Sequence, residues 1–520
     1  MTDDLTEESA AHVRQLLADV LAHADHEAFM ALIWAVNALQ TGRSDKALPF
    51  FRGVPAGAAT EGIVGPHAVY PWELETLANE LLTTPRRSRY TTFDAKGWPS
   101  VTALVNLLRR LEGAEYAARR AQLPIMQELG RISARQFEWQ RGFTTTAEFY
   151  RSVSVYGQGD SARYLAEEHK LTVADMTFVG YGLMAGFLLD PVMRPGSDLK
   201  VFQALGVAPE RLQAVLARIA RPISHVVEIA PGARAEGDAT AYKPSVLRQF
   251  PCITFGPRGR RMRAPLPDLI VSRVTSGLFY DVVGGGGAVR ADYGRRFEAY
   301  VLRLLGAMLP QMPFEREFSY RAAGEDIASP DILLTEADDS LRLIIECKAT
   351  RMSFNARFSE DPSGERGYEE MAKGVAQIWR FFSHCRRGLT GRALSNDVRG
   401  LLLSLDDWFV ARPGMIEKVM VRAEVIAGDM DPGIVVGDRR PVTFASIAQL
   451  ESVLRVATPE TLLQAVEEAA KVDRYGWLLS SIHTDLFGTG LQRRPFPFDD
   501  ELEELLPWWR LVRQARDAQL

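Results

Sequence analysis

The chain is poor in cysteine and has no long uncharged apolar run. Its 520 residues include only three cysteines, Cys252, Cys347 and Cys385, which disfavours a disulfide framework and a cysteine-based zinc site. No stretch of about 18 apolar residues free of charge occurs, so no membrane span is expected. The acidic start at residues 1–4 lacks the basic residues of a secretion signal. We therefore expect a cytoplasmic protein.

A large excess of one charge is also missing. The formal net charge is -5 at pH 7, with 24% charged residues. This balance neither supports nor excludes a nucleic-acid partner, because phosphate recognition needs a local basic surface rather than a basic protein. We find no confident helix-turn-helix, zinc finger or histidine pair with further metal ligands nearby. The composition is that of an ordinary globular protein.

Two regions of different pattern follow one another along the chain. Residues 1–230 are predicted to be mostly helical, a region for sensing or for binding a partner or nucleic acid. Residues 231–245 are small and polar, which indicates a linker or long loop. Strands, turns and helices then alternate over residues 246–410. Residues 411–520 are expected to pack on that domain or to mediate oligomerisation, and the whole fold to be α+β.

The stretch at residues 329–350 (SPDILLTEADDSLRLIIECKAT) predicts two adjacent strands. Residues 331–335 form the first strand, residues 337–340 the turn and residues 341–348 the second strand. Period-two alternation sorts the second strand into two faces. One face carries Leu341, Leu343, Ile345 and Cys347, and the other carries Ile344, Glu346 and Lys348. Asp331 begins the neighbouring strand, close enough to meet Glu346 and Lys348.

Two carboxylates and an ammonium that meet on neighbouring strands can bind a metal ion and assist its chemistry. Asp331 and Glu346 can hold Mg²⁺ or Mn²⁺, hard cations that prefer oxygen ligands, and the backbone carbonyl of Cys347 can add a third oxygen. Such a cation polarises a phosphodiester and lowers the pKa of a bound water. Lys348 can orient that water and stabilise developing negative charge. The pattern predicts a catalytic centre of Asp331, Glu346 and Lys348.

Pro330-Asp331 followed by Glu346-Cys347-Lys348 resembles the motif of the PD-(D/E)XK nuclease superfamily. The core of that superfamily runs helix, three strands, helix, strand. In this chain the same order is expected from a helix at 292–305, a strand at 314–320, the two motif strands, a helix at 368–382 and a strand at 401–405. The resemblance thus covers about residues 290–410 and implies a restriction-endonuclease-like α/β domain with a mixed central sheet.

The resemblance also implies roles for residues outside the motif. Glu298 matches an acidic residue that supports metal binding. Gln377 matches a residue that orients the site, and Lys373, one helical turn before it, is expected to contact nucleic acid. Upstream, the loop-like sequence GPRGRRMRAP is the other candidate for phosphate contact. It supplies Arg258, Arg260, Arg261 and Arg263.

The function expected from the resemblance is hydrolysis of phosphodiester bonds, with DNA as the first candidate substrate, in restriction, antiviral defence or repair. Two alternatives stay open: an RNase or tRNA-cleaving toxin that uses the same residues, and a non-catalytic nucleic-acid-binding or assembly module. The expected partners are nucleic acid and a protein partner or a second copy of the chain. No membrane is expected.

Overall fold

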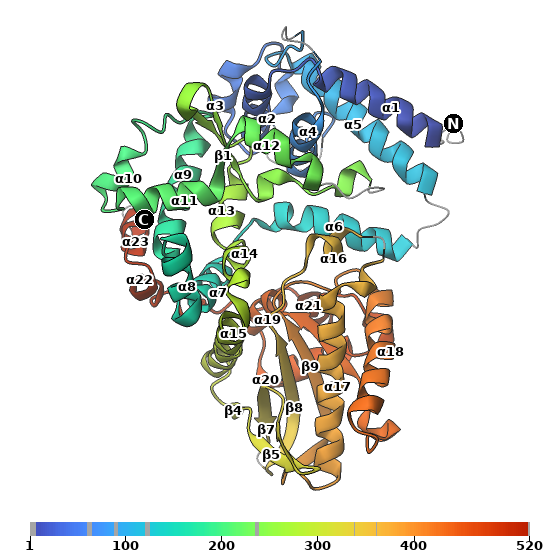
Figure 1. The fold of residues 1–520 in the computed structure, drawn as a ribbon. Coiled ribbons are helices and arrows are strands. Elements are labelled where there is room, and N and C mark those ends of the chain that lie inside the picture. The colour runs from blue at the N-terminus through green and yellow to red at the C-terminus, as the bar shows by residue number, and fades with distance from the viewer. Residues whose placement is uncertain are drawn as a thin grey trace. The chain divides into compact units, whose positions relative to one another are not determined.

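A computed structural model describes residues 7–59, 65–87, 92–119, 125–233, 239–336, 338–359 and 361–517. The fold is mixed, with 60% of residues in helices and 11% in strands, and a helical region precedes a region that contains the main sheet (Figure 1). The α+β class and the order of these two regions are therefore confirmed. Residue 337 of the predicted turn lies outside the described residues.

The chain divides into two compact units that alternate along the sequence. The first comprises Met1–Leu123, Arg135–Thr145 and Ala162–Val282, and the second comprises Pro124–Ala134, Thr146–Ser161 and Val283–Leu520. The last division falls at Val282 rather than in the expected linker at 231–245. Thr240 and Tyr242 of that segment are buried, and Glu115 accepts hydrogen bonds from the amide and hydroxyl of Thr240. Residues 234–238 of the predicted linker lie outside the described residues.

The first unit is built mainly from helices, as the sequence predicts, with a small sheet late in its sequence. Its three strands, β1 (Ala220–Pro222), β2 (Cys252–Phe255) and β3 (Arg261–Arg263), pair in the order β1-β2-β3. Its helices are α1 (Glu7–Leu21), α2 (His26–Gln40), α3 (Ser44–Ala47), α4 (Pro71–Thr83), α5 (Trp98–Arg119), the end of α6 (Ile125–Arg141), most of α8 (Gly159–His169), α9 (Val173–Leu189), α10 (Lys200–Ala204), α11 (Pro209–Ile219), α12 (Ile223–Ile229), α13 (Asp268–Val274) and α14 (Leu278–Val282).

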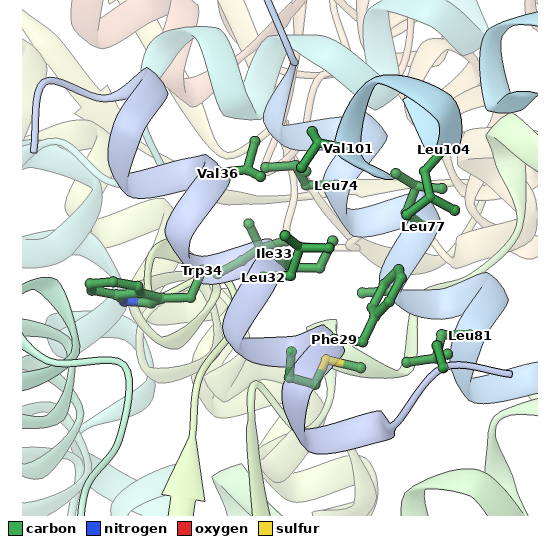
Figure 2. Packing of buried hydrophobic residues seen from close by; sticks show 14 of the residues in the cluster. Phe29, Leu32, Ile33, Trp34, Val36, Leu74, Leu77, Leu81, Val101 and Leu104 are labelled. Carbon is green, nitrogen blue, oxygen red and sulfur yellow. The ribbon is translucent and has the colours of Figure 1, made fainter. Parts of the chain in front are cut away.

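Helix α2 is the centre of the first unit's core. It starts after Asp25, whose side chain accepts a hydrogen bond from the Ala28 amide and so caps the helix. Its residues from Phe29 to Leu39 are almost all apolar, and all of them except Ala31 are buried. Figure 2 shows this helix packed against Leu74 and Leu77 of α4 and its neighbours. A helix that is apolar on every side must be enclosed by other helices, which explains the helical character of this unit.

The second unit contains the main sheet and the helices that pack on it. Its strands are β4 (Phe314–Arg316), β5 (Ser319–Ala322), β6 (Glu325–Ala328), β7 (Ile332–Thr335), β8 (Ser340–Lys348), β9 (Ala393–Ser404) and β10 (Val442–Ser446). Its helices include α7 (Thr146–Tyr156), α15 (Gly286–Met308), α16 (Phe354–Phe358), α17 (Arg366–Arg386), α18 (Pro413–Met430), α19 (Ile447–Leu454), α20 (Pro459–Ala469), α21 (Leu479–Phe487), α22 (Leu502–Leu505) and α23 (Trp509–Asp517).

The five-stranded sheet has the order β10-β9-β8-β7-β4. The first three strands along the chain, β4, β7 and β8, are antiparallel neighbours, whereas β8, β9 and β10 run parallel. Helix α17 packs on β8 and β9, and α18 packs on α17 (Figure 1). The predicted order of helix, three strands, helix and strand is thus confirmed by α15, β4, β7, β8, α17 and β9.

Two details of the predicted strands are wrong. The segment at 314–320 is divided, because β4 pairs with β7 while β5 pairs with β6. In β8 the register against both neighbours shifts around Arg342. This extra residue moves Leu341 onto the face of Ile344, and both belong to the core cluster formed with α17. A bulge inserts one extra residue and so reverses which face the residues before it occupy. From Leu343 to Lys348 the side chains lie on the faces that the sequence predicts.

The C-terminal extension contributes an edge of the main sheet. Strand β10 pairs in parallel with β9, from Val442 opposite Gly400 to Ser446 opposite Ser404. Residues 442–446 of this extension therefore share a sheet with the strand β9 that precedes it.

Within the described ranges, no single helix has the length and apolarity to cross a membrane. The pair formed by α8 and α9, bent by 71°, passes the same test of length and composition when taken together.

Candidate active site

Asp331 is fixed in place by the backbone of the neighbouring strand. It lies one residue before β7, and Ile332 of β7 pairs with Ile345 of β8. Its Oδ2 atom accepts a hydrogen bond of 2.6 Å from the amide of Cys347. A carboxylate held by a backbone donor in a sheet has little freedom to reorient. The hairpin predicted from the sequence therefore brings Asp331 to the end of β8 that carries Glu346 and Lys348.

Glu346, Lys348 and Gln377 form a chain of hydrogen bonds. The Lys348 ammonium donates to Glu346 Oε1 at 2.7 Å and to Gln377 Oε1 at 2.8 Å. Glu346 is only 4% exposed, and the side chain of Lys348 is 15% exposed. Gln377 comes from α17, which packs on this face of β8. The structure thus unites three residues from β8 and α17 that sequence reasoning assigned to one centre.

Gly374 of α17 sets how closely that helix approaches the strand. A Cβ atom at this position would lie 2.5 Å from Leu402 Cδ1 and 2.8 Å from Lys348 Cε, and 3.4 Å from Glu346 Cγ. Real side chains do not tolerate the first two separations. The absence of a side chain at 374 therefore lets Gln377, one turn later, reach the Lys348 ammonium.

Gly374→Ala is expected to destabilise the protein by about 1–3 kcal/mol, because overpacking forces the helix away from β8. Thermal unfolding of the full chain measures this change. The control is Gly294→Ala in α15, where a Cβ would meet nothing within 4 Å, and where alanine is expected to stabilise the helix by about 0.5–1 kcal/mol. Equal effects of the two substitutions would show that the close approach at Gly374 has no energetic consequence.

The carboxylates of this region are crowded and poorly solvated. Burial, followed by repulsion from Glu346 and Glu298, raises the pKa of Asp331 to about 9. Burial also raises the pKa of Glu346, although Lys348 opposes the change. The pKa of Glu298 on α15 is raised by burial and then by Glu317 and Glu346. These mutual effects place Glu298 within the electrostatic reach of the motif residues.

Lys348 is the cation that balances these acids. Burial alone would lower its pKa, but attraction to Glu346 and the hydrogen bond between the two side chains raise it above its ordinary value. Lys348 therefore stays protonated at neutral pH. One ammonium faces three acids, Asp331, Glu346 and Glu298, so the cluster would carry an excess of negative charge if all three were ionised. Without a bound cation, Asp331 therefore keeps its proton at neutral pH.

Two residues of this cluster were missed by sequence reasoning. Glu317 follows β4, its backbone amide donates to the Asp331 carbonyl at 3.0 Å, and it raises the pKa of both Glu298 and Glu346. Arg380 lies one turn after Gln377 and lowers the pKa of Glu346, while its buried Nε atom has no hydrogen-bond partner within the described residues. Neither residue belongs to the motif, and only the fold brings them near it.

The residues present fit a divalent cation such as Mg²⁺ or Mn²⁺. Asp331 and Glu346 each accept a hydrogen bond through one oxygen, from the Cys347 amide and the Lys348 ammonium respectively. The crowding of acids favours an added cation. Among the residues that the structure describes, no group of three or more His, Cys, Asp or Glu side chains is already arranged as a metal site. The pair Asp331 and Glu346, with Glu298 nearby, is the set that would hold the ion.

The other predicted residues of this region are Cys347 and Lys373. The thiol of Cys347 is buried, and its amide rather than its carbonyl makes the contact with Asp331. Lys373 is 47% exposed at the side chain and lies 3.7 Å from Glu370 Oε1, so it borders the centre without joining the Lys348 chain of hydrogen bonds.

The predicted arginine cluster lies in the first unit, not in the unit of the candidate site. Arg261 donates two hydrogen bonds of 2.7 Å to Glu27, and Arg263 donates one of 3.0 Å to the same carboxylate. Arg258 and Arg260 belong to the turn between β2 and β3. The expectation that this basic segment is part of the 246–410 domain is wrong, because Glu27 ties it to α2 of the helical unit.

Comparisons of the chain with protein-family models, with curated proteins and with solved structures found no match. The chemistry of the site therefore rests on its own residues.

Proposed function

We propose that the chain is a metal-dependent nuclease that hydrolyses phosphodiester bonds, with DNA as its substrate. One observation carries the proposal: Asp331, Glu346 and Lys348 meet at one end of a central sheet, in surroundings that keep the lysine charged and leave the carboxylates short of a cation. Buried, mutually repelling carboxylates are costly to a fold and usually serve a function. The order of the surrounding elements is the one that the PD-(D/E)XK resemblance implies.

The roles follow from the contacts. Asp331 and Glu346 would hold the divalent cation, supported by Glu298. When bound, that ion supplies Lewis-acid polarisation of the phosphodiester. Lys348 donates a hydrogen bond to the attacking water and stabilises charge on the phosphate oxygens in the transition state. Gln377 keeps the ammonium of Lys348 in this orientation through its 2.8 Å hydrogen bond.

Substrate binding needs positive charge beside an acidic centre. Arg380 and Lys373 lie on α17 at helical spacing from Gln377, so all three share one side of the helix. Arg380 already acts on Glu346 electrostatically. We assign these two side chains to the phosphates that flank the scissile bond. The reducing cytoplasm fits the three buried free thiols, and a role in restriction or antiviral defence is proposed by analogy with the superfamily.

The test is cleavage of supercoiled plasmid, linear DNA and structured RNA by the full chain with Mg²⁺, Mn²⁺ or EDTA. We expect DNA to be cut only with a divalent cation, and Glu346→Gln to lower the rate at least about 10²-fold, because a ligand carboxylate is lost. Glu325→Gln, which changes an exposed carboxylate of β6, is the matched control. If the chain cut RNA but not DNA, the proposed function would change to that of an RNase.

A wild-type chain that cuts none of these substrates under any of the conditions would contradict the proposal. Full activity of Glu346→Gln would show that the cutting belongs to another place in the chain or to a contaminant.

A further inference from the structure

Three arginines of the first unit lie within electrostatic reach of one another, and two of them face a single carboxylate, away from every residue assigned above. Arg218 comes from α11, Arg221 from β1 and Arg273 from α13, and the carboxylate is that of Asp281 in α14. All four residues belong to the same compact unit. Asp281 is 6% exposed, so its environment is one in which unbalanced charge is costly.

Arg273 occupies both oxygens of Asp281. Its Nη1 donates to Oδ2 at 2.7 Å and its Nη2 to Oδ1 at 2.9 Å. Its remaining donors reach the carbonyls of Gln249 and Gly277, at 3.2 and 3.3 Å. Arg218 lies further off, with 3.6 Å between its Nη1 and Asp281 Oδ1. The single carboxylate is thus largely neutralised by one of the three guanidinium groups.

Arg221 has no carboxylate partner within the described part of the chain. Its Nη1 donates to the carbonyls of Ala217 and of Ala220, and its guanidinium lies 4.4 Å from the centre of the Phe250 ring. Its pKa is lowered by burial and then by repulsion from Arg218 and Arg273. The Nε and Nη2 groups of Arg221 make no hydrogen bond that the structure records, so a planar pair of donors is left over.

His169 does not change the balance of charge. Arg218 Nη2 donates to its Nδ1 atom, so this nitrogen is an acceptor, and its Nε2 atom lies 3.2 Å from the Asp281 carbonyl, to which it donates. A histidine with one acceptor and one donor nitrogen is neutral. Three guanidinium groups and one carboxylate therefore leave a net charge of +2 in this cluster.

We propose that Arg218 and Arg221 bind a phosphate group, with Arg273 adding charge from behind. A phosphate monoester carries about two negative charges near neutral pH, which matches the excess. The planar fork of a guanidinium can donate two parallel hydrogen bonds to two oxygens of one phosphate group. The ligand class is a phosphate ester, either of a mononucleotide or of a nucleic-acid backbone. This inference does not depend on the nuclease proposal, and it gives the helical unit a sensing or binding role.

Isothermal titration of the full chain tests the site with inorganic phosphate, adenosine 5′-monophosphate, adenosine and a short single-stranded oligonucleotide. We expect the phosphorylated compounds to bind and adenosine not to bind. Arg221→Gln is expected to weaken phosphate binding roughly 10-fold or more, since a charged bidentate contact is lost. The control is Arg110→Gln, an exposed arginine of α5 in the same unit, which should bind as the wild type does.

The same titrations also distinguish a mononucleotide from a nucleic-acid backbone as the source of the phosphate group. Stronger binding of the oligonucleotide than of the mononucleotide assigns the site to a nucleic-acid backbone, and the reverse assigns it to a free nucleotide. Thermal unfolding in a phosphate-free chloride buffer checks that the variant folds. Arg221→Gln removes a cation that Arg218 and Arg273 repel, so its unfolding temperature should be no lower than that of the wild type. Absence of binding by all phosphorylated probes, or equal affinity in Arg221→Gln, would overturn the proposal.

Discussion

Replacing Lys348 with methionine is expected to lower the rate of metal-dependent DNA cleavage at least about 10²–10³-fold, the usual loss when one donor to developing charge is removed. Methionine keeps much of the length of the lysine side chain. It cannot donate to Glu346 or Gln377, which both accept from the ammonium now. The carboxylates that we propose as metal ligands stay in place, so we expect the variant to bind Mn²⁺ and yet fail to cut.

The measurement pairs cleavage rates with titration of Mn²⁺ into each variant. Lys418→Met is the matched control, because Lys418 is 51% exposed on α18 and pairs only with Asp361 at the surface. The control should cut at the wild-type rate, since surface pairs contribute little. If Lys348→Met cut as fast as the wild type, Lys348 would have no part in the reaction.

Asp331→Asn is expected to change activity and stability in opposite directions. Cleavage and Mn²⁺ binding should be lost, because the amide cannot replace a charged ligand. In the metal-free chain the same substitution should stabilise the fold by at least about 1 kcal/mol, since one unit of pKa shift corresponds to about 1.4 kcal/mol. The asparagine replaces an acid that burial, and then Glu346 and Glu298, keep protonated in the folded chain, so folding no longer requires the uptake of that proton.

The pH dependence of this effect has a definite sign. In the unfolded chain an aspartate ionises at about pH 4, whereas in the metal-free folded chain the pKa of Asp331 is raised to about 9. The folded state therefore holds this proton more tightly. The contribution of Asp331 to stability is full below about pH 4 and is lost as the pH rises through about 9. The advantage of asparagine should accordingly grow between pH 5 and pH 8.

Thermal unfolding in EDTA at these two pH values tests the prediction, with Asp326→Asn in the exposed strand β6 as the control. The control should leave both unfolding temperatures unchanged. A lower unfolding temperature for Asp331→Asn at pH 8 would mean that the 2.6 Å hydrogen bond from the Cys347 amide outweighs the repulsion between the carboxylates.

The motif residues could be predicted because their arrangement is local. Asp331, Glu346 and Lys348 lie within one hairpin, and the alternation of side chains along a strand decides which of them share a face. Residue 341 shows the limit of this logic. The bulge at Arg342 depends on how β8 pairs with β7 and β9, and single-sequence periodicity does not reveal such pairing.

The other features of the site and of its surroundings could not be predicted, because they depend on contacts between distant parts of the sequence. Glu27 pairs with Arg261 across 234 residues and also with Arg263, so two of the four arginines that looked available for nucleic acid are already paired. Glu317 becomes a neighbour of Glu346 only when β4 pairs with β7, and Arg380 only when α17 packs on β8. Gly374 is one of 41 glycines, and only the packing of α17 on β8 gives it a role.

The alternation of the two compact units along the chain limits how this protein could have been assembled or could be taken apart. Six segments belong to the units in turn, so the chain passes between the units five times, and the helices α6 and α8 each have residues in both. A cut before residue 283 would leave the sheet-bearing part without α7, whose Arg151 pairs with Glu451 in a buried contact. The orphaned glutamate would cost about 3–5 kcal/mol. Gene fusion at a single junction could not have produced this arrangement, and no single proteolytic cleavage can release either half intact.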